Sequence, residues 1–168
     1  MVDHVKQLGV KNTCILTGDN DLAARRVTSA VHIDSVYSEL LPEEKLEHVK
    51  KLKEKYTVAV IGDGINDALA LSDAHIGIAM GAMGSDTAIQ SADIALMNNS
   101  LDNIPYAIQL ARRTKAIIFQ NIIIAFATSF VMIFLAACGI VTAMLGAFLH
   151  NIGAFVILLN SGRLLRRQ

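Results

Sequence analysis

The sequence predicts an α/β fold: a partial, doubly wound parallel sheet, followed by a two-helix transmembrane hairpin. Up to about residue 115, short apolar runs rich in β-branched residues alternate with amphipathic segments. This alternation is typical of parallel strands joined by crossover helices. From Ala116 to Leu159 the chain then has no Asp, Glu, Lys or Arg. Because one membrane span needs about 20 apolar residues, this stretch is long enough for two.

We expect the two spans at Ile117 to Cys138 and at about Thr142 to Asn160, with a turn at Gly139. Basic residues flank the uncharged stretch on both sides, and such flanks favour the cytoplasmic face of a membrane. Two spans place both flanks there at once, so both termini should be cytoplasmic. The alternative is a pair of buried core helices in a soluble protein. The flanking residues are Arg112, Arg113 and Lys115, and then Arg163, Arg166 and Arg167.

The chain should therefore divide into four parts. These are an α/β part at 1–100, a linking helix at 101–115, the two spans at 116–162 and a basic tail at 163–168. The formal net charge is zero, which argues against nucleic acid as a partner. The two cysteines, Cys14 and Cys138, suggest neither a disulfide framework nor a zinc spacing.

Capping residues mark the helices of the α/β part. Gly9 should close the first helix, and Asn20 or Asp21 should cap the second. Pro42 suits the first turn of a third helix, because its fixed backbone angle and missing N–H are tolerated there. The expected helices span residues 2–8, 22–31 and 42–55, with further helices from Ala68, around 87–90, and from Leu101 into the first span.

Five short apolar runs are expected to form the strands, at residues 12–16, 36–37, 58–61, 75–80 and 93–97. The run from Val58 to Ile61 has three β-branched residues among four, which favours a strand buried on both faces. In open α/β sheets, ligands bind beyond the carboxyl ends of the strands. The residues that follow each strand are therefore the candidates for chemistry.

The string Gly62-Asp-Gly-Ile-Asn-Asp67 follows the central strand. Its glycines permit a sharp turn, and its two carboxylates, Asp63 and Asp67, come within one helical turn of each other. Carboxylates held close together need a compensating cation. Hard oxygen ligands with little nitrogen or sulfur nearby suit Mg²⁺ better than Zn²⁺. On its own, a turn with solvated acidic residues would also explain the pattern.

Two further positions could hold a phosphate group. Thr17 follows a strand, beside backbone amides that Gly18 leaves accessible. Lys45 lies on the first turn of the helix that Pro42 begins, where its ammonium could neutralise phosphate charge. Taken singly, Thr17 would be a helix cap and Lys45 a solvated lysine.

The order of these motifs resembles motifs two to four of the haloacid-dehalogenase phosphotransferases, and the Gly62–Asp67 string resembles the GDGxND signature of P-type ATPases. The resemblance implies that Thr17 and Gly18 contact the phosphoryl group and that Asp19 helps to close the nucleotide domain. It implies that Lys45 contacts an acyl phosphate and that Asp63 binds Mg²⁺. Asn66 and Asp67 would complete the hydrogen-bonded shell around the magnesium site.

The resemblance implies ATP as substrate, Mg²⁺ as cofactor and a phosphorylated aspartate as intermediate. Such an intermediate splits hydrolysis into two easier steps. The Asp-Lys-Thr-Gly-Thr string that would carry this aspartate does not occur between Met1 and Gln168. We therefore expect a carboxy-terminal part of a pump, inactive by itself, that needs the amino-terminal part as its partner.

Two membrane helices after the α/β part resemble the heavy-metal-transporting branch of the family. Asn121, Asn160 and Ser161 resemble polar positions of that branch. His150 and Asn151 in the second span are the candidate ligands of the transported metal, and their imidazole and amide groups favour a divalent ion such as Zn²⁺, Cd²⁺ or Co²⁺ over Cu⁺. The expected location is the plasma membrane, with membrane lipid around the spans.

Two other functions remain open at this point. One is a membrane-tethered regulatory fragment that binds Mg²⁺ or phosphate without catalysis. The other is a phosphatase domain with a membrane anchor, although that activity needs the same nucleophilic aspartate. An upstream Asp-Lys-Thr-Gly-Thr string in the gene would distinguish the pump from both.

Overall fold

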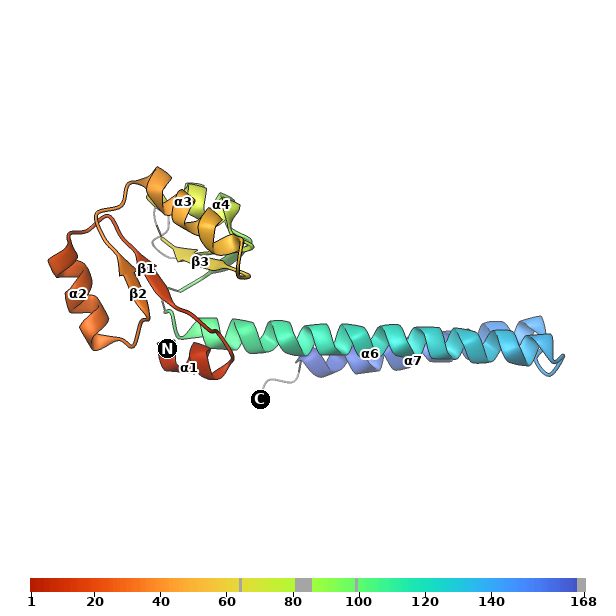
Figure 1. Ribbon diagram of the computed structural model, residues 1–168. Coiled ribbons are helices and arrows are strands. Elements are labelled where there is room, and N and C mark those ends of the chain that lie inside the picture. Colours follow the sequence, from red (N-terminus) through yellow and green to blue (C-terminus); the bar gives the residue numbers. More distant parts are fainter. Residues whose placement is uncertain (64, 81–85, 99, 166–168) are drawn as a thin grey trace. The chain divides into compact units, whose positions relative to one another are not determined.

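The computed structural model describes residues 1–63, 65–80, 86–98 and 100–165. The chain divides into two compact units, Met1–Tyr106 and Ala107–Gln168. The first unit contains short strands and helices, and the second is formed by long helices (Figure 1).

Strands and helices alternate through the first unit, as the sequence predicts. Its helices are α1 (Val2–Gln7), α2 (Asp21–Ala30), α3 (Pro42–Lys53), the 3-10 turn η1 (Ile65–Asp67), α4 (Ala68–Asp73) and α5 (Asp86–Gln90). Its strands are β1 (Cys14–Leu16), β2 (Ser35–Tyr37), β3 (Ala59–Gly62), β4 (Ile76–Met80) and β5 (Ile94–Leu96).

The five strands form two parallel sheets instead of one. Strand β1 pairs with β2, and a second sheet has the order β3-β4-β5. Every pairing is parallel, as expected for a doubly wound fold. Within the residues that the structure describes, β1 and β3 each have a single partner strand, so one edge of each is open.

Strand β3 is less buried than its composition predicts, and the expectation that both its faces are covered is wrong. Ile61 is 39% exposed, and Val60 is half-buried. Strand β4 holds the central position instead, with Ile78 and Ala79 both buried. An edge strand pairs on one side only, so a run of apolar residues there does not ensure burial.

The core of the first unit lies between β4 and the helices that cover it. Leu71 of α4 and Ala79 of β4 are fully buried, and Val60, Ile89 and Ala92 pack against them. Gly77 is required at this contact, because a Cβ atom there would lie 2.6 Å from the carbonyl oxygen of Leu71. Figure 1 shows α3 and α4 together beside β3, and α2 beside the β1–β2 pair.

Local signals account for where the helices begin and end. Gly9 has a positive φ of 87°, which closes α1 as expected. The Asn20 side chain accepts a hydrogen bond from the amide of Ala23 at 2.9 Å and caps α2. At the start of α3, the Glu44 carboxylate accepts one from the amide of Leu41 at 2.8 Å.

An exposed carboxylate, Asp34, joins α1 to β1 and β2. It accepts hydrogen bonds from Lys6 Nζ at 2.6 Å, and from the amide and hydroxyl of Thr13, both at 2.8 Å. These hydrogen bonds lower the pKa of Asp34 from 3.8 to about 2, and the bond from Lys6 has a larger effect than those from Thr13. These contacts fasten the first helix to the first sheet.

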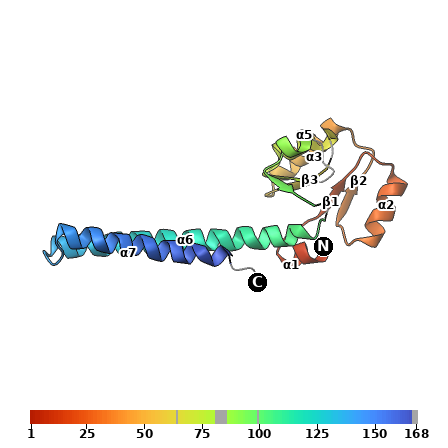
Figure 2. The same cartoon turned by 180° about the vertical axis from the view of Figure 1, so that it is seen from behind.

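The second unit is a helical hairpin. Helix α6 (Asn103–Ala137) begins in the first unit and continues without interruption through the uncharged stretch, as expected from the sequence. Gly139, with φ of 70°, allows the turn, and the Thr142 hydroxyl caps α7 (Ala143–Gly162). A last turn, η2, spans Arg163–Leu165. The two long helices lie side by side in both views (Figures 1 and 2).

The hairpin helices meet through small and polar residues and leave their large apolar side chains outside. A Cβ atom on Gly153 would lie 3.7 Å from the Thr128 side chain, so the helices approach closely there. Phe126, Phe130 and Met144 are 73%, 78% and 88% exposed. Both helices are long and apolar enough to cross a membrane. In a soluble protein, core helices would bury these side chains, so their exposure argues against a pair of buried core helices.

Candidate functional site

The acidic residues of the Gly62–Asp67 string lie at the carboxyl end of β3. Asp63 is exposed directly after the strand, and η1 turns the chain so that Asp67 returns over Gly62. A Cβ atom on Gly62 would lie 2.7 Å from the Cβ of Asp67. Glycine is therefore required at position 62 for Asp67 to occupy its place. Asn66 is exposed on the same turn.

Lys45 reaches this string from α3. Its Nζ donates a hydrogen bond to Asp67 Oδ1 at 2.8 Å, and the two side chains are only 12% and 22% exposed. Partial burial strengthens the attraction between opposite charges relative to water. The fold thus brings together two of the predicted site residues that lie 22 positions apart in the sequence.

The third predicted motif forms a turn after β1. The Thr17 hydroxyl donates to Asp19 Oδ2 at 3.0 Å and accepts from the amide of Asp19 at 3.1 Å. Thr17 is half-buried, whereas Gly18 and Asp19 are exposed. Among the described residues, no hydrogen bond joins Thr17 to Lys45 or Asp67. The Thr17–Asp19 turn is therefore positioned by its backbone.

The segment 39–41 connects this turn to α3. The amide of Leu40 donates to the Thr17 carbonyl at 3.0 Å, and the amide of Glu39 donates to the Asp19 carbonyl at 2.8 Å. Glu39 adopts a left-handed conformation with φ of 58°, which is uncommon for a residue with a side chain. Two residues after Glu39, Leu41 is the N-cap of α3, the helix that carries Lys45. Glu39 and Leu40 were not predicted from the sequence, because nothing in their residue types signals this role.

A second lysine on α3, also missed, anchors the other end of that helix. Lys53 Nζ donates to the carbonyl oxygen of Asp73 and, at 3.1 Å, to its carboxylate. Asp73 is the last residue of α4. Helix α3 is thus attached at its beginning through Lys45 and at its end through Lys53, so the Lys45 ammonium has little freedom to move. The sequence signal for Lys53 was only a charged helix end.

The residues after β3 fit a magnesium ion. The Asp63 carboxylate is exposed and makes no hydrogen bond or ion pair within the described residues, so its oxygens are available. Those residues contain no group of three or more His, Cys, Asp or Glu side chains that could form a closed metal site. Mg²⁺ does not need one, because it binds through one or two carboxylates and keeps water or phosphate oxygens as its other ligands.

The predicted metal ligands of α7 are accessible but not assembled. His150 is exposed, and the Asn151 side chain donates to the Ala147 carbonyl of its own helix at 2.9 Å. The contact with α6 passes instead through other polar residues. Asn160 donates to Asn121 at 2.9 Å, and Asn121 donates to Ser161 at 2.9 Å. Within this hairpin, His150 and Asn151 would need ligands from elsewhere.

The chain is similar in sequence to known proteins. A family model described as a haloacid dehalogenase-like hydrolase matches residues 1–75. A cadmium-transporting ATPase of Staphylococcus aureus is 43% identical over 168 residues, which is 99% of this chain and 23% of that protein. A cadmium, zinc and cobalt-transporting ATPase of Bacillus subtilis is 39% identical and covers 98% of this chain.

The likeness extends to the three-dimensional structure. The crystal structure of a zinc-transporting PIB-type ATPase in its E2.Pi state superposes with a TM-score of 0.91, at 39% sequence identity. It covers 98% of this chain, and the match takes up 27% of that protein. The chain spans about a quarter of the length of the relatives that it matches. Over nearly its whole length, the chain thus belongs to the heavy-metal-transporting P1B branch of the P-type ATPases, with part of the haloacid dehalogenase-like domain and two long apolar helices.

Proposed function

We propose that the protein that carries this chain exports a divalent transition metal, such as Zn²⁺, Cd²⁺ or Co²⁺, and drives export by ATP through a phosphorylated aspartate. The observation that best supports this function is the pairing of Lys45 with Asp67 beside the exposed Asp63 carboxylate. An ammonium and a cation-binding carboxylate at one strand end are what a transferred phosphoryl group requires, because its charge is spread over several oxygens.

Each site residue has a role in this proposal. Asp63, with Asn66 and Asp67 behind it, would hold Mg²⁺, which would offset phosphoryl charge when bound. Lys45 would neutralise a phosphoryl oxygen, held in place by its contact with Asp67. The Thr17 hydroxyl and the Gly18 backbone would contact the same group, and Asp19 would face the nucleotide domain.

The nucleophilic aspartate lies outside these 168 residues, and the sheet suggests how it would join them. Strands β1 and β3 each have an open edge among the described residues. One additional parallel strand between them would unite the two sheets. Its carboxyl end would then fall between Thr17 and Asp63. We propose that the amino-terminal part of the pump supplies this strand, and that residues 1–168 alone do not hydrolyse ATP.

The helices would form the transport half of the protein. We propose that α6 and α7 span the plasma membrane as a hairpin with both termini in the cytoplasm, surrounded by lipid. The expected parts are the α/β part at 1–100, the link at 101–115, the spans at 116–162 and the tail at 163–168. His150 and Asn151 would contribute to the transported-metal site, together with ligands from other helices.

Phosphorylation by labelled ATP tests the catalytic half of this proposal. The full-length gene product should take up acid-stable label in the presence of Mg²⁺, and Asp63→Ala should abolish it. Asp21→Ala is the matched control, because Asp21 pairs only with Arg25, on the surface of α2, among the residues that the structure describes. Normal labelling of the Asp63 variant would reduce Asp63 to a turn residue.

The 168-residue chain is the second arm of the same experiment. It should take up no acid-stable label, because the aspartate that accepts phosphate is missing from it. Label on this chain, removed by mutation of one of its own aspartates, would overturn the assignment of the nucleophile. If the full-length gene product also failed to become labelled, a membrane-tethered fragment that binds Mg²⁺ or phosphate would be the better description.

Cysteine accessibility tests the topology. A cysteine introduced at Arg112 and another at Leu164 should both react with a membrane-impermeant reagent only from the cytoplasmic side. This result follows from the basic flanks of the hairpin. Labelling of the two positions from opposite sides would exclude a hairpin.

A further inference from the structure

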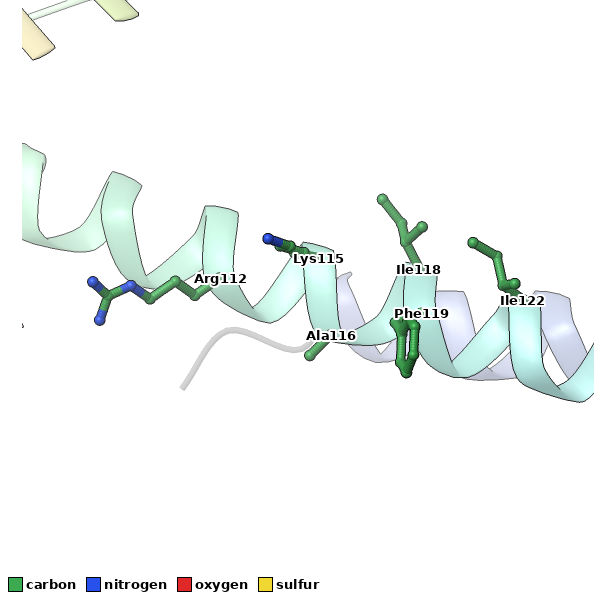
Figure 3. A pocket seen from close by; sticks show the side chains of 6 residues that line it. All are labelled: Arg112, Lys115, Ala116, Ile118, Phe119 and Ile122. Atoms are coloured by element: carbon green, nitrogen blue, oxygen red, sulfur yellow. The ribbon is translucent and has the colours of Figure 1, made fainter. Parts of the chain in front are cut away.

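An open pocket lies along α6 at the start of its uncharged stretch. It has a volume of about 470 Å³ and is lined by Arg112, Lys115, Ala116, Ile118, Phe119 and Ile122. Figure 3 shows these side chains along one stretch of the helix, with the basic pair at one end and the large apolar groups at the other. Ten residues of helix extend about 15 Å, so the pocket is long enough for a headgroup and the upper part of an acyl chain.

The basic residues of this pocket have no acidic partner in the hairpin. No Asp or Glu occurs after Asp102, whereas the hairpin unit contains six Arg and Lys residues. Among the described residues, neither Arg112 nor Lys115 forms a salt bridge or a side-chain hydrogen bond. An uncompensated pair of cations beside apolar surface is complementary to a ligand that has both an anionic and an apolar part.

Helix α7 adds a third cation at the same end of the hairpin. Asn160 donates to Gln120 at 3.4 Å and to Asn121 at 2.9 Å, which fixes the end of α7 against the first turns of the uncharged stretch. Arg163 donates to Asn160 Oδ1 at 3.1 Å and is therefore attached to this contact. Its guanidinium has no carboxylate partner among the described residues.

We propose that this pocket binds an anionic phospholipid of the cytoplasmic leaflet. Arg112 and Lys115 would bind the headgroup phosphate, and Ile118, Phe119 and Ile122 would contact the acyl chain. Juxtamembrane basic residues attract anionic lipid with about 1 kcal/mol each, which corresponds to about fivefold in affinity. The inference goes beyond metal transport and rests on the proposed membrane placement of α6 and α7.

Tryptophan quenching can test this binding at the pocket itself. The chain has no tryptophan, so Phe119→Trp introduces a single reporter at the apolar end of the pocket. The 168-residue chain with this change is reconstituted into phosphatidylcholine bilayers that contain either brominated phosphatidylcholine or brominated phosphatidylglycerol. We expect brominated phosphatidylglycerol to reach half-maximal quenching at a mole fraction at least about fivefold lower than brominated phosphatidylcholine does, because the anionic lipid occupies the pocket preferentially.

Charge variants in the same background separate a site from general attraction. Arg112→Gln with Lys115→Gln should make the two lipids equal, whereas Arg112→Lys with Lys115→Arg should preserve the preference. Lys50→Gln with Lys55→Gln is the matched control, since it removes the same charge from exposed positions outside the hairpin. This control should leave the preference unchanged.

Three outcomes would overturn the inference. Equal quenching by both lipids in the Phe119→Trp chain, without any charge substitution, would mean that the basic residues only orient the helices in the membrane. Loss of the preference in excess inorganic phosphate would assign the pocket to a free anion. Absence of quenching by either lipid would place α6 outside the bilayer, which would overturn the proposed membrane placement as well.

Discussion

Lys45 Nζ lies 2.8 Å from Asp67 Oδ1, and both side chains are largely buried. The contact joins the first turn of α3 to the turn that follows β3. Among the described residues, it is the one side-chain hydrogen bond that joins two of the predicted phosphate- and magnesium-binding motifs. The pair therefore offers a direct way to separate a catalytic role from a structural one.

Replacing Lys45 by Ala should abolish function while the protein still folds. Without the ammonium, Asp67 keeps a partly buried charge and the phosphoryl group loses a cation. We expect phosphorylation by ATP in the full-length protein to fall on the order of 100-fold or more. Lys53→Ala is the control at the other end of α3: it should cost about 1 kcal/mol of stability and leave phosphorylation of the folded protein unchanged. Equal effects of the two variants on phosphorylation would contradict this assignment.

Two glycines should respond differently to alanine. A Cβ on Gly62 would meet Asp67 at 2.7 Å, so Gly62→Ala should displace that carboxylate. The main effect of this variant should therefore be a loss of phosphorylation, with a smaller effect on the free energy of unfolding. A Cβ on Gly77 would meet the Leu71 carbonyl at 2.6 Å inside the core, so Gly77→Ala should destabilise the fold by about 1–3 kcal/mol. Thermal unfolding and phosphoenzyme assays on both variants check this. A Gly62 variant with normal phosphorylation would mean that Asp67 tolerates displacement.

The low pKa of Asp34 predicts a dependence of stability on acid. Its carboxylate is stabilised by Lys6 and Thr13, which lowers the pKa from 3.8 to about 2. The contribution to stability is thus fully present above about pH 4 and is lost as the pH falls toward 2. Lys6→Gln should raise the pKa of Asp34 toward 3.8, as measured by the carboxyl ¹³C shift of Asp34 during titration. An unchanged pKa in that variant would show that Thr13 alone stabilises the carboxylate.

His150 should matter for metal dependence. It is the eighth residue of α7, about 12 Å along the helix, which is close to the middle of a 30 Å hydrocarbon layer. An ionisable group at that depth normally serves a transport path. In the full-length protein, His150→Ala should weaken metal-stimulated ATPase activity and leave phosphorylation by inorganic phosphate intact.

His4→Ala, on the exposed surface of α1, is the control for that experiment. If metal dependence were unchanged in the His150 variant, the imidazole would be a packing residue. The transported-metal site would then lie on other helices.

The sequence by itself determined the local structure and the residue types of the candidate site. Gly9, Asn20 and Pro42 predicted helix ends correctly, because a cap depends on neighbours within one turn. The absence of charged residues from Ala116 to Leu159 predicted two long apolar helices, because this signal depends on composition alone.

Only the tertiary structure decided what depends on partners far apart in the sequence. The contact of Lys45 with Asp67, the left-handed Glu39 that joins the Thr17 turn to α3, and the second anchor at Lys53 depend on how α3 packs against α4 and η1. The exposure of Ile61 depends on β3 having one partner strand, which its apolar sequence does not reveal. Likewise, Asn121 and Asn160 lie 39 positions apart and meet only through the packing of α6 against α7, which also sets the direction of their side chains.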